Sequence, residues 1–332
     1  MHRNRTVLIL LLFALVLVSL AGCCFGASSV SPQEILKATF SGDLSGTAGR
    51  ILLYVRLPRL MAAILAGSAL SAAGLLLQSV LRNPLASPSV IGINAGAGLG
   101  ALICGVFFPA AAGFIPLAAF LGACAAAFSV YLLARLTGAS RSTVILAGVA
   151  VNSILGACMD AIVTIVPDAV SNRSAFAIGG FEYATLTRLG FAAPLIGLAL
   201  LAALLLGREL NLMVLGDEVA AGLGLRVERF RALFLIAAAM LSGAAVSFAG
   251  LIGFVGLIAP HMARILCKDD PRLRIPVTII FGALLCVVCD LIARTAFAPY
   301  ELPVGIVLSF LGAPFFLALL MGRKRRSRHH AD

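Results

Sequence analysis

Long stretches without charge constrain this chain more than any other feature. In its 332 residues, no charged side chain occurs in 60–81, 83–134, 189–207, 232–263 or 302–322. A helix needs about 20 apolar residues to cross a bilayer core of about 30 Å, and each charge buried there costs about 2.5 kcal/mol or more. Hydrophobic residues make up 61% of the chain and charged ones 12%, whereas soluble domains average about 25% charged. The chain is predicted to be an all-α integral membrane protein.

Dividing the apolar sequence at proline, glycine and charge predicts about ten transmembrane helices. The eighth is too short to span alone, because residues 232–266 are fewer than the about 40 that two full crossings need. One crossing must therefore be abbreviated, which predicts an irregular interior helix. The ten are 7–24, 60–81, 90–108, 114–134, 143–166, 189–206, 232–252, 256–266, 275–293 and 304–321.

Basic residues predict the orientation. Ten crossings put both termini on one side, and with cytoplasmic termini the inside segments hold 18 of the 25 Lys and Arg residues, leaving seven outside. This predicts a multi-pass protein of the cytoplasmic membrane with both termini cytoplasmic. The net charge of +11 is attributed to orientation, so no nucleic-acid partner is expected. Residues 1–322 are predicted to form the transmembrane domain and 323–332 a basic cytoplasmic tail.

Two segments repeat within the chain. "AGSALSAAG" at 66–74 and "SGAAVSFAG" at 242–250 agree at five of nine positions, and Pro84 and Pro260 each follow the last glycine by ten residues. In the predicted topology these two helices run in opposite directions. That favours an inverted repeat with a transport path between the halves. Chance recurrence of a small-residue packing pattern is the alternative.

Other short patterns receive plainer interpretations. Gly92, Gly96 and Gly100 form GxxxGxxxG, which predicts close helix packing rather than a nucleotide loop. Cys286 and Cys289 lie in an apolar run and are interpreted as core residues. "LAGC", ending at Cys23, matches the site at which lipoprotein precursors are cleaved. Because membrane helices follow it, we interpret it as a chance match within a retained first helix.

Four segments together resemble one family. They are "RLPRLMAAILAGSALSAAGLLLQSVLRNPLASPSVIGINAGAGLGA", "LAGVAVNSILGA", "GFVGLIAPHMARIL" and "ELPVGIVLSFLGAPFFLALL". In order and spacing, from about Leu57 to Leu320, they resemble the FecCD-type permeases of ATP-binding-cassette importers. The resemblance implies a type II importer permease fold with an inverted repeat. It implies inward transport of a metal chelate by alternating access, most often iron-siderophore, with haem or cobalamin as alternatives.

The same resemblance implies the partners. These are a second permease subunit (a homodimer or a paralogue), two cytoplasmic ATPases, an extracytoplasmic solute-binding protein, the metal-chelate substrate and membrane lipid. The sequence lacks GxxxxGK[ST], so it has no such phosphate-binding loop and a separate partner is expected to hydrolyse ATP. The chain itself is predicted to be no enzyme and to hold no cofactor and no metal of its own.

The segment 209–231 resembles the family's coupling segment, which contacts the ATPase. Two acidic residues near the start of a predicted short helix suit its dipole, and the glycines permit a tight turn. A solvated connector is the alternative. The residues expected to couple are Asp217, Glu218, Val219, Ala220, Gly222, Leu223 and Gly224.

Three arginines on the predicted outer side resemble those that pair with acidic residues of the binding protein. Arg56 and Arg59 stand at i and i+3, with Pro58 suited to the first turn of the helix, and Arg294 lies near the end of the ninth helix. Anchoring at the membrane interface is the alternative.

Polar residues within apolar segments are candidates for the path. Family resemblance assigns the cytoplasmic exit to Asn83, Pro84, Leu85, Ser142 and Thr143. Gln78, Asn94 and Asn152 either line the path or bond between helices. Asp160 and Asp290 are candidates for a proton relay, and Asp290 is alternatively an ion-pair partner of Arg294. A proton-coupled transporter is therefore the main rival mechanism. The residues left open are Gln78, Asn94, Asn152, Asp160, Asp290 and His261.

Overall fold

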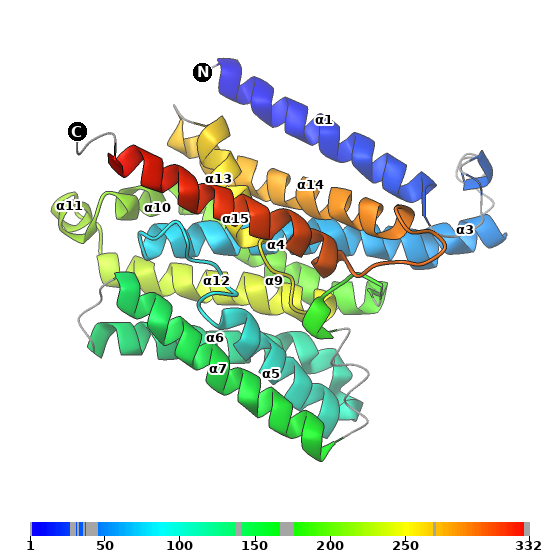
Figure 1. The fold of residues 1–332 in the computed structure, drawn as a ribbon, viewed down its shortest axis with the longest axis horizontal. Coiled ribbons are helices and arrows are strands. Elements are labelled where there is room, and N and C mark those ends of the chain that lie inside the picture. The colour runs from blue at the N-terminus through cyan, green and yellow to red at the C-terminus, as the bar shows by residue number, and fades with distance from the viewer. Residues whose placement is uncertain are drawn as a thin grey trace.

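A computed structural model describes residues 2–26, 31, 33–35, 37, 46–136, 141–166, 176–182, 184–267 and 270–328. Helices make up nearly all of these ranges, which contain no strand (Figure 1). The elements are α1 (His2–Cys24), α3 (Thr47–Ile51), the π-helical turn η1 (Leu52–Arg56), α4 (Leu57–Val80), α5 (Ile93–Phe107), η2 (Pro109–Phe114), α6 (Ile115–Leu136), α7 (Arg141–Ile165), α9 (Leu186–Leu205), α10 (Gly207–Val214), α11 (Asp217–Gly222), α12 (Val227–Ala249), α13 (Val255–Leu266), η4 (Pro271–Leu273), α14 (Arg274–Thr295) and α15 (Val304–Arg328).

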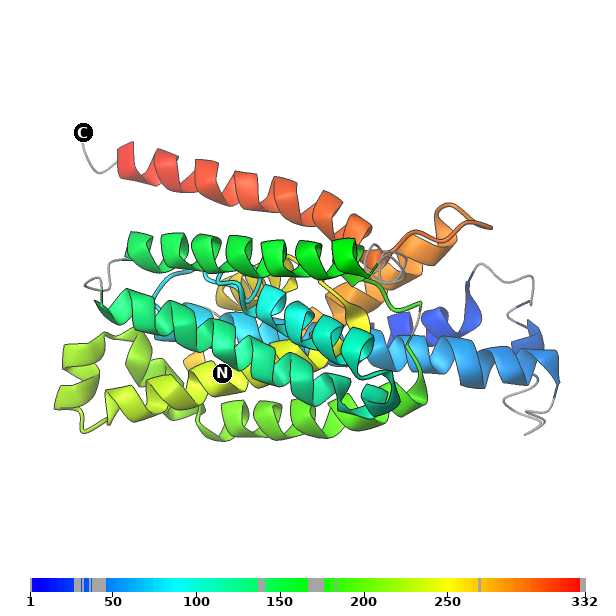
Figure 2. The ribbon, with the colours of Figure 1, turned by 90° about the horizontal axis from the view of Figure 1, so that it is seen from below.

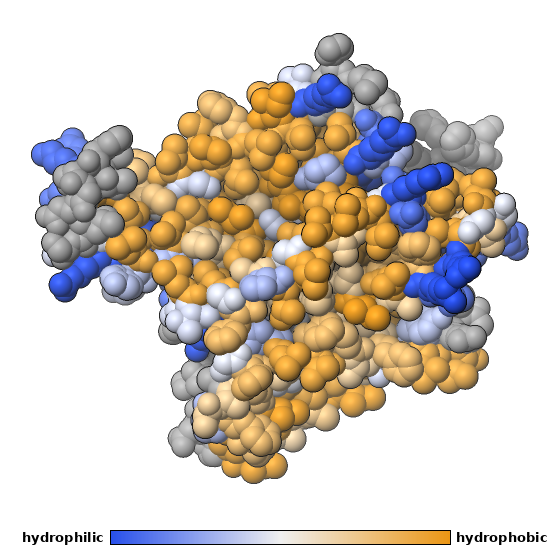
Figure 3. All heavy atoms as spheres, turned by 180° about the vertical axis from the view of Figure 1, so that it is seen from behind, coloured by the Kyte–Doolittle hydropathy of each residue, from blue (hydrophilic) through white to orange (hydrophobic). Residues whose placement is uncertain are grey.

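The ten predicted membrane helices are present. In the described part of the chain, seven helices are long and apolar enough to cross a membrane, and three shorter apolar ones are 93–107, 255–266 and 304–318. The abbreviated helix expected after residue 252 is α13, whose 12 residues are largely buried. Figure 3 shows the surface these helices create, with apolar residues across the middle of the face and most hydrophilic residues toward its two ends.

Several helix boundaries differ from the prediction, three of them as follows. The second membrane helix does not begin near Pro58 but continues back through η1 to Thr47, because a wide π-helical turn accommodates the proline ring and its missing N–H. The seventh begins at Val227, so its first turns carry charge. The last runs to Arg328, past residue 321, where the helix was expected to end.

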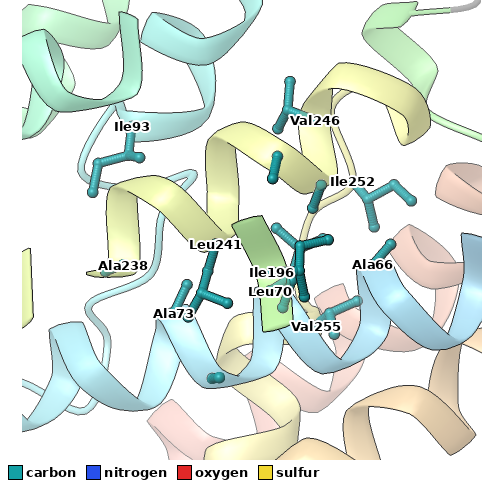
Figure 4. Packing of buried hydrophobic residues seen from close by; sticks show 14 of the residues in the cluster. Ala66, Leu70, Ala73, Ile93, Ile196, Ala238, Leu241, Val246, Ile252 and Val255 are labelled. Atoms are coloured by element: carbon teal, nitrogen blue, oxygen red, sulfur yellow. The ribbon is translucent and has the colours of Figure 1, made fainter. Parts of the chain in front are cut away.

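Helix α4 lies at the centre of the bundle and contacts α14, α12, α13 and α9. Small residues let these helices approach closely: a Cβ on Gly67 would lie 2.3 Å from the Gly282 carbonyl oxygen, and one on Gly74 only 1.9 Å from that of Gly256. Figure 4 shows Ala66, Leu70 and Ala73 of α4 facing side chains of α12 and α13. In a bilayer, where lipid is as apolar as leucine, such close packing holds helices together.

The predicted internal repeat has a structural counterpart. Helices α4 and α12 pack against each other and run in opposite directions (Figure 1). Each leads through an irregular loop into a short helix. The residue before that helix has a left-handed backbone conformation in both cases: Gly92 (φ 82°) before α5 and Phe254 (φ 64°) before α13. Gly92 therefore supplies a turn, whereas Gly96 and Gly100 pack α5 against α6 as expected.

The bundle has two distinct ends. The start of α1, the end of α15 and α11 lie at one end, which we call the α11 end, and α3 lies at the opposite end, which we call the arginine end (Figure 1). Helices α7 and α15 lie on one face (Figure 2). Their outer positions carry large exposed apolar side chains, including Leu146, Ile154 and Phe310.

Candidate functional site

The three predicted docking arginines come together at the arginine end. Arg56, Arg59 and Arg294 are each at most 5% exposed, so none projects freely from the isolated chain. The nitrogen Nε of Arg59 donates to Oδ1 of Asp290 at 2.7 Å, and Nη1 of Arg59 donates to the Glu301 carboxylate. Arg294 lies on the other side of Asp290, with its Nε 3.3 Å from Oδ2. Buried charges are costly unless they are paired in this way.

The end of α1 is part of the same cluster. Nη1 of Arg56 donates to the carbonyl oxygens of Cys23 and Cys24, both at 2.7 Å, and Nη2 of Arg294 donates to that of Gly22 at 2.7 Å. The last carbonyls of a helix have no partner within it and carry its negative partial charge. Two arginines therefore cap α1, which integrates the "LAGC" segment into the fold.

A further carboxylate lies beside this cluster. Burial raises the pKa of Glu182, with the positive charge of Arg59 opposing the shift and the carboxylates of Asp290 and Glu301 adding to it. Glu182 belongs to the segment 176–182, outside the membrane-spanning helices. Three acidic side chains thus accompany the three arginines in this cluster.

The structure settles one open question in this cluster. Asp290 is held by Arg59 and Arg294, so the ion pair, not a solvated proton relay, describes its surroundings. Sequence reasoning missed Glu301 and Glu182. Glu301 stands directly before "LPVG", where a carboxylate next to a predicted helix start at the basic end could have been noticed. The docking role of the arginines stays a prediction.

The predicted coupling segment folds as two short helices at the α11 end. Leu210 and Met213 anchor α10 against the bundle, and Ala220 is the buried residue of α11. Val219 and Leu223, one turn apart, are 51% and 61% exposed. Glu218 is also exposed, and Gly224 takes a left-handed turn after α11 (φ 85°), as expected from its type.

Arg231 connects this segment to two core helices. Its Nη2 donates to Oδ2 of Asp217 at 2.7 Å and its Nη1 to Oε1 of Glu228 at 2.6 Å. The hydroxyl of Tyr131 on α6 donates to the other oxygen of Glu228 at 2.6 Å. The start of α11 is therefore tied to α12 and, through Glu228, to α6. The sequence prediction explained Asp217 by the helix dipole alone and missed Arg231.

The predicted exit residues begin directly after α4. Asn83 is buried, and its Oδ1 accepts a hydrogen bond from the backbone N–H of Leu85 at 3.0 Å, which fixes the turn that carries Pro84. Ser142 and Thr143 lie in the first turn of α7, and their side chains fall outside the described residues. Their role at the exit stays a prediction.

The other polar candidates bond between helices, line a cavity, or do both. Gln78 bonds between helices, donating to the Gly256 carbonyl and accepting from Arg264, and Asn94 donates to the Ile252 carbonyl. Asn152 is exposed on α7 and, together with Asn94, lines a cavity of about 300 Å³ between α5, α7 and residues 251–253.

No metal site emerges from the described residues. They contain no group of three or more His, Cys, Asp or Glu side chains that could hold a metal ion. Cys286 and Cys289 are fully buried, as the core interpretation expects. His261 makes an edge-to-face contact with Phe315 of α15, with 5.6 Å between ring centroids.

A helical bundle with two short core helices and opposed repeat units defines a membrane-embedded transport subunit. The model of the FecCD transport family matches residues 10–322, and the chain belongs to this family. It is therefore the permease subunit of an ATP-binding-cassette importer, a transport component and not an enzyme.

Individual relatives agree with this assignment. The achromobactin transport system permease protein CbrC of Dickeya dadantii is 39% identical, over 97% of this chain and 92% of its own length. The hemin transport system permease protein HmuU of Yersinia pestis is 35% identical, over 98% and 97%. A solved structure described as an inward-facing metal-chelate type ABC transporter superposes with a TM-score of 0.80 at 26% identity, covering 96% of this chain and 99% of that one.

Proposed function

We propose that this permease imports a metal chelate, foremost an iron-siderophore, across the cytoplasmic membrane. The observation that carries the cargo class is similarity over nearly the full length to permeases named for achromobactin and hemin transport. The α11 end would face the cytoplasm, where the positive-inside rule puts most of the Lys and Arg residues.

The proposed ATPase contact is α11. Val219 and Leu223 expose apolar side chains on a short helix at the end of the bundle, beyond the span that begins at Val227. Apolar side chains that meet water at such a point favour a protein partner. Changing Leu223 to Asp should prevent ATPase association, whereas changing the exposed Arg229 to Gln should not.

The proposed path runs along the face that carries α7 and α15. Asn152 and Asp160 lie two turns apart on α7 and both are exposed. An exposed carboxylate facing lipid would be costly, so a water-filled path between this chain and a second permease subunit suits this face better. The cavity beside Asn152 opens onto it.

The arginine end is proposed to receive the solute-binding protein through Arg56, Arg59 and Arg294. Charge-assisted pairs with carboxylates of that protein would give both orientation and rapid docking. Because these arginines are engaged within the isolated chain, docking requires exchange of partners. Reversing both Arg56 and Arg59 to Glu should abolish uptake while the permease–ATPase complex still assembles, and normal uptake would refute the docking role.

Reconstitution tests the whole proposal. The permease, its ATPase and its binding protein are placed in liposomes, and uptake of ferric siderophore, hemin and cobalamin is compared with and without ATP. We expect ATP-dependent uptake of ferric siderophore that requires the binding protein. Preference for hemin or cobalamin would reassign the cargo, and uptake driven by a proton gradient without nucleotide would favour the rival mechanism.

A further inference from the structure

Every one of the three arginines is already bonded to this chain. The acceptors are of two kinds: main-chain carbonyl oxygens at the end of α1, and the carboxylates of Asp290 and Glu301. A carboxylate arriving from outside must therefore replace one of these acceptors. The question is which acceptor can leave most easily.

Exposure distinguishes the two carboxylates. The side chain of Asp290 is 3% exposed and lies between Arg59 and Arg294, whereas that of Glu301 is 34% exposed and, among the described residues, bonds Arg59 alone. An ion pair that water reaches contributes little, because solvation replaces most of what is lost, whereas breaking a buried pair leaves a charge without compensation. Glu301 is therefore the acceptor that can be exchanged.

Arg59 is also incompletely bonded. Its Nη2 is buried and has no hydrogen-bond partner among the described residues, although Nε and Nη1 are both engaged. A guanidinium can hold two carboxylates through its separate edges, and a second oxygen near Nη2 would complete its bonding. The position thus favours an incoming carboxylate over the present arrangement.

Glu301 is connected to the path-lining face through its own loop. It lies three residues before α15 begins at Val304. The N–H of Leu302 donates to the Ala293 carbonyl at 2.9 Å, and the N–H of Gly305 donates to the Gly179 carbonyl at 3.0 Å. The backbones meet so closely that a Cβ on Gly305 would lie 1.8 Å from the Ile178 carbonyl oxygen. Movement of Glu301 would therefore reach the first turn of α15 directly.

We propose that Glu301 is an internal competitor for Arg59: it holds this arginine in the free permease and is displaced by a carboxylate of the docking solute-binding protein. Its release frees the loop 296–303 and the start of α15, so docking is transmitted to the face that lines the path. The inference rests on the proposed docking role of Arg59. It adds that Glu301 opposes docking and that displacement of Glu301 conveys docking to α15.

The test compares Glu301→Gln with Glu34→Gln in the permease–ATPase complex in nanodiscs. Glu34, an exposed carboxylate in the segment between α1 and α3, forms reciprocal bonds with Ser31 rather than with the arginines, so it controls for lost charge. Removing the competitor should tighten binding of the cognate binding protein by about two- to fivefold, the worth of a half-exposed ion pair. It should also raise ATPase activity in the absence of that protein. A residue needed only for folding would change both in the opposite direction.

The variant Arg59→Gln distinguishes a failure of this inference from a failure of the docking role on which it rests. If Arg59→Gln weakens docking and Glu301→Gln tightens it, the inference holds. If Arg59→Gln weakens docking but Glu301→Gln leaves it unchanged or weaker, the inference is wrong and the docking role stands. If Arg59→Gln leaves docking unchanged, both are wrong. Glu301→Asp, which keeps the charge but shortens the side chain, should fall between wild type and Glu301→Gln and guards against an unstable amide variant.

Discussion

Arg231 of α12 binds Asp217, the first residue of α11, with 2.7 Å between Nη2 and Oδ2. The pair joins a helix with exposed apolar side chains to a helix of the bundle core. Its partners are 16% and 46% exposed, so it contributes about 1 kcal/mol or less to stability. The pair fixes the position of α11 relative to α12, and with the proposed ATPase contact at α11 it would carry movement of α11 to α12.

Changing Arg231 to Gln should therefore uncouple transport from ATP hydrolysis. We expect the complex to assemble and hydrolyse ATP while uptake per ATP falls several-fold, because α11 is no longer fixed to α12. Arg229→Gln, two residues away and exposed, is the matched control. Uptake and hydrolysis that fall in parallel in Arg231→Gln would contradict this role.

Asp290 and Glu301 should differ sharply in their effect on stability. Asp290→Asn leaves two buried arginines without their shared carboxylate, for which we expect a loss of about 3–5 kcal/mol. Glu301→Gln removes a partly exposed pair and should cost about 1 kcal/mol or less. Denaturation of the purified permease in detergent measures both. Equal losses would mean that burial does not set the strength of these pairs.

The number of helices and the short α13 were predictable because bilayer thickness sets a length that apolar runs either reach or miss. The start of the second helix was not, since Pro58 favours a helix start and nothing local indicates that a π-helical turn carries the helix back to Thr47. Contacts between segments far apart in the sequence could not be predicted either. Arg59 and Asp290 lie 231 residues apart, and spacing alone cannot place one beside the other.

The glycine contacts of α4 predict a strong size limit. A Cβ on Gly74 would lie 1.9 Å from the Gly256 carbonyl oxygen, so Gly74→Ala must push α13 away from α4. We expect it to cost at least the about 1–3 kcal/mol typical of overpacking. Gly197 of α9 has open space around it, and Gly197→Ala should be neutral or slightly stabilising. Thermal unfolding in detergent compares them, and similar midpoints for the two variants would argue against close α4–α13 packing.

Helix α1 should be retained in the mature protein. Cleavage before Cys23 would remove the Gly22 carbonyl that accepts from Arg294 and the helix that packs along α14. Intact-mass measurement of the purified protein should therefore include residues before Cys23 and no attached lipid. Cys23→Ser should leave the mass otherwise unchanged, because Arg56 uses only the main-chain oxygen of that residue. A lipidated chain beginning at Cys23 would overturn this expectation.

The two candidate ends were predictable to different degrees. Asp217 and the glycines after it mark a short helix and its turn locally, and α11 begins and ends where they predict. The arginines were found as well, but their burial was not, because it depends on Asp290, Glu301 and the end of α1 arriving from elsewhere in the chain. The sequence identified the positively charged residues, and only the structure showed which groups of the same chain they already bind.

Finally, the exposed face of α7 should be reached by water although it lies within the membrane. Asn152 lines the cavity beside residues 251–253, whereas Phe13 of α1 is a 60% exposed apolar residue of the kind that faces lipid. In a chain whose native cysteines, including the exposed Cys158, are replaced by serine, Asn152→Cys should react with a water-soluble thiol reagent. Phe13→Cys should react far more slowly, because thiolate formation requires water. Cargo held in the path should protect Asn152→Cys, and equal labelling at both positions would show that α7 faces lipid and not the path.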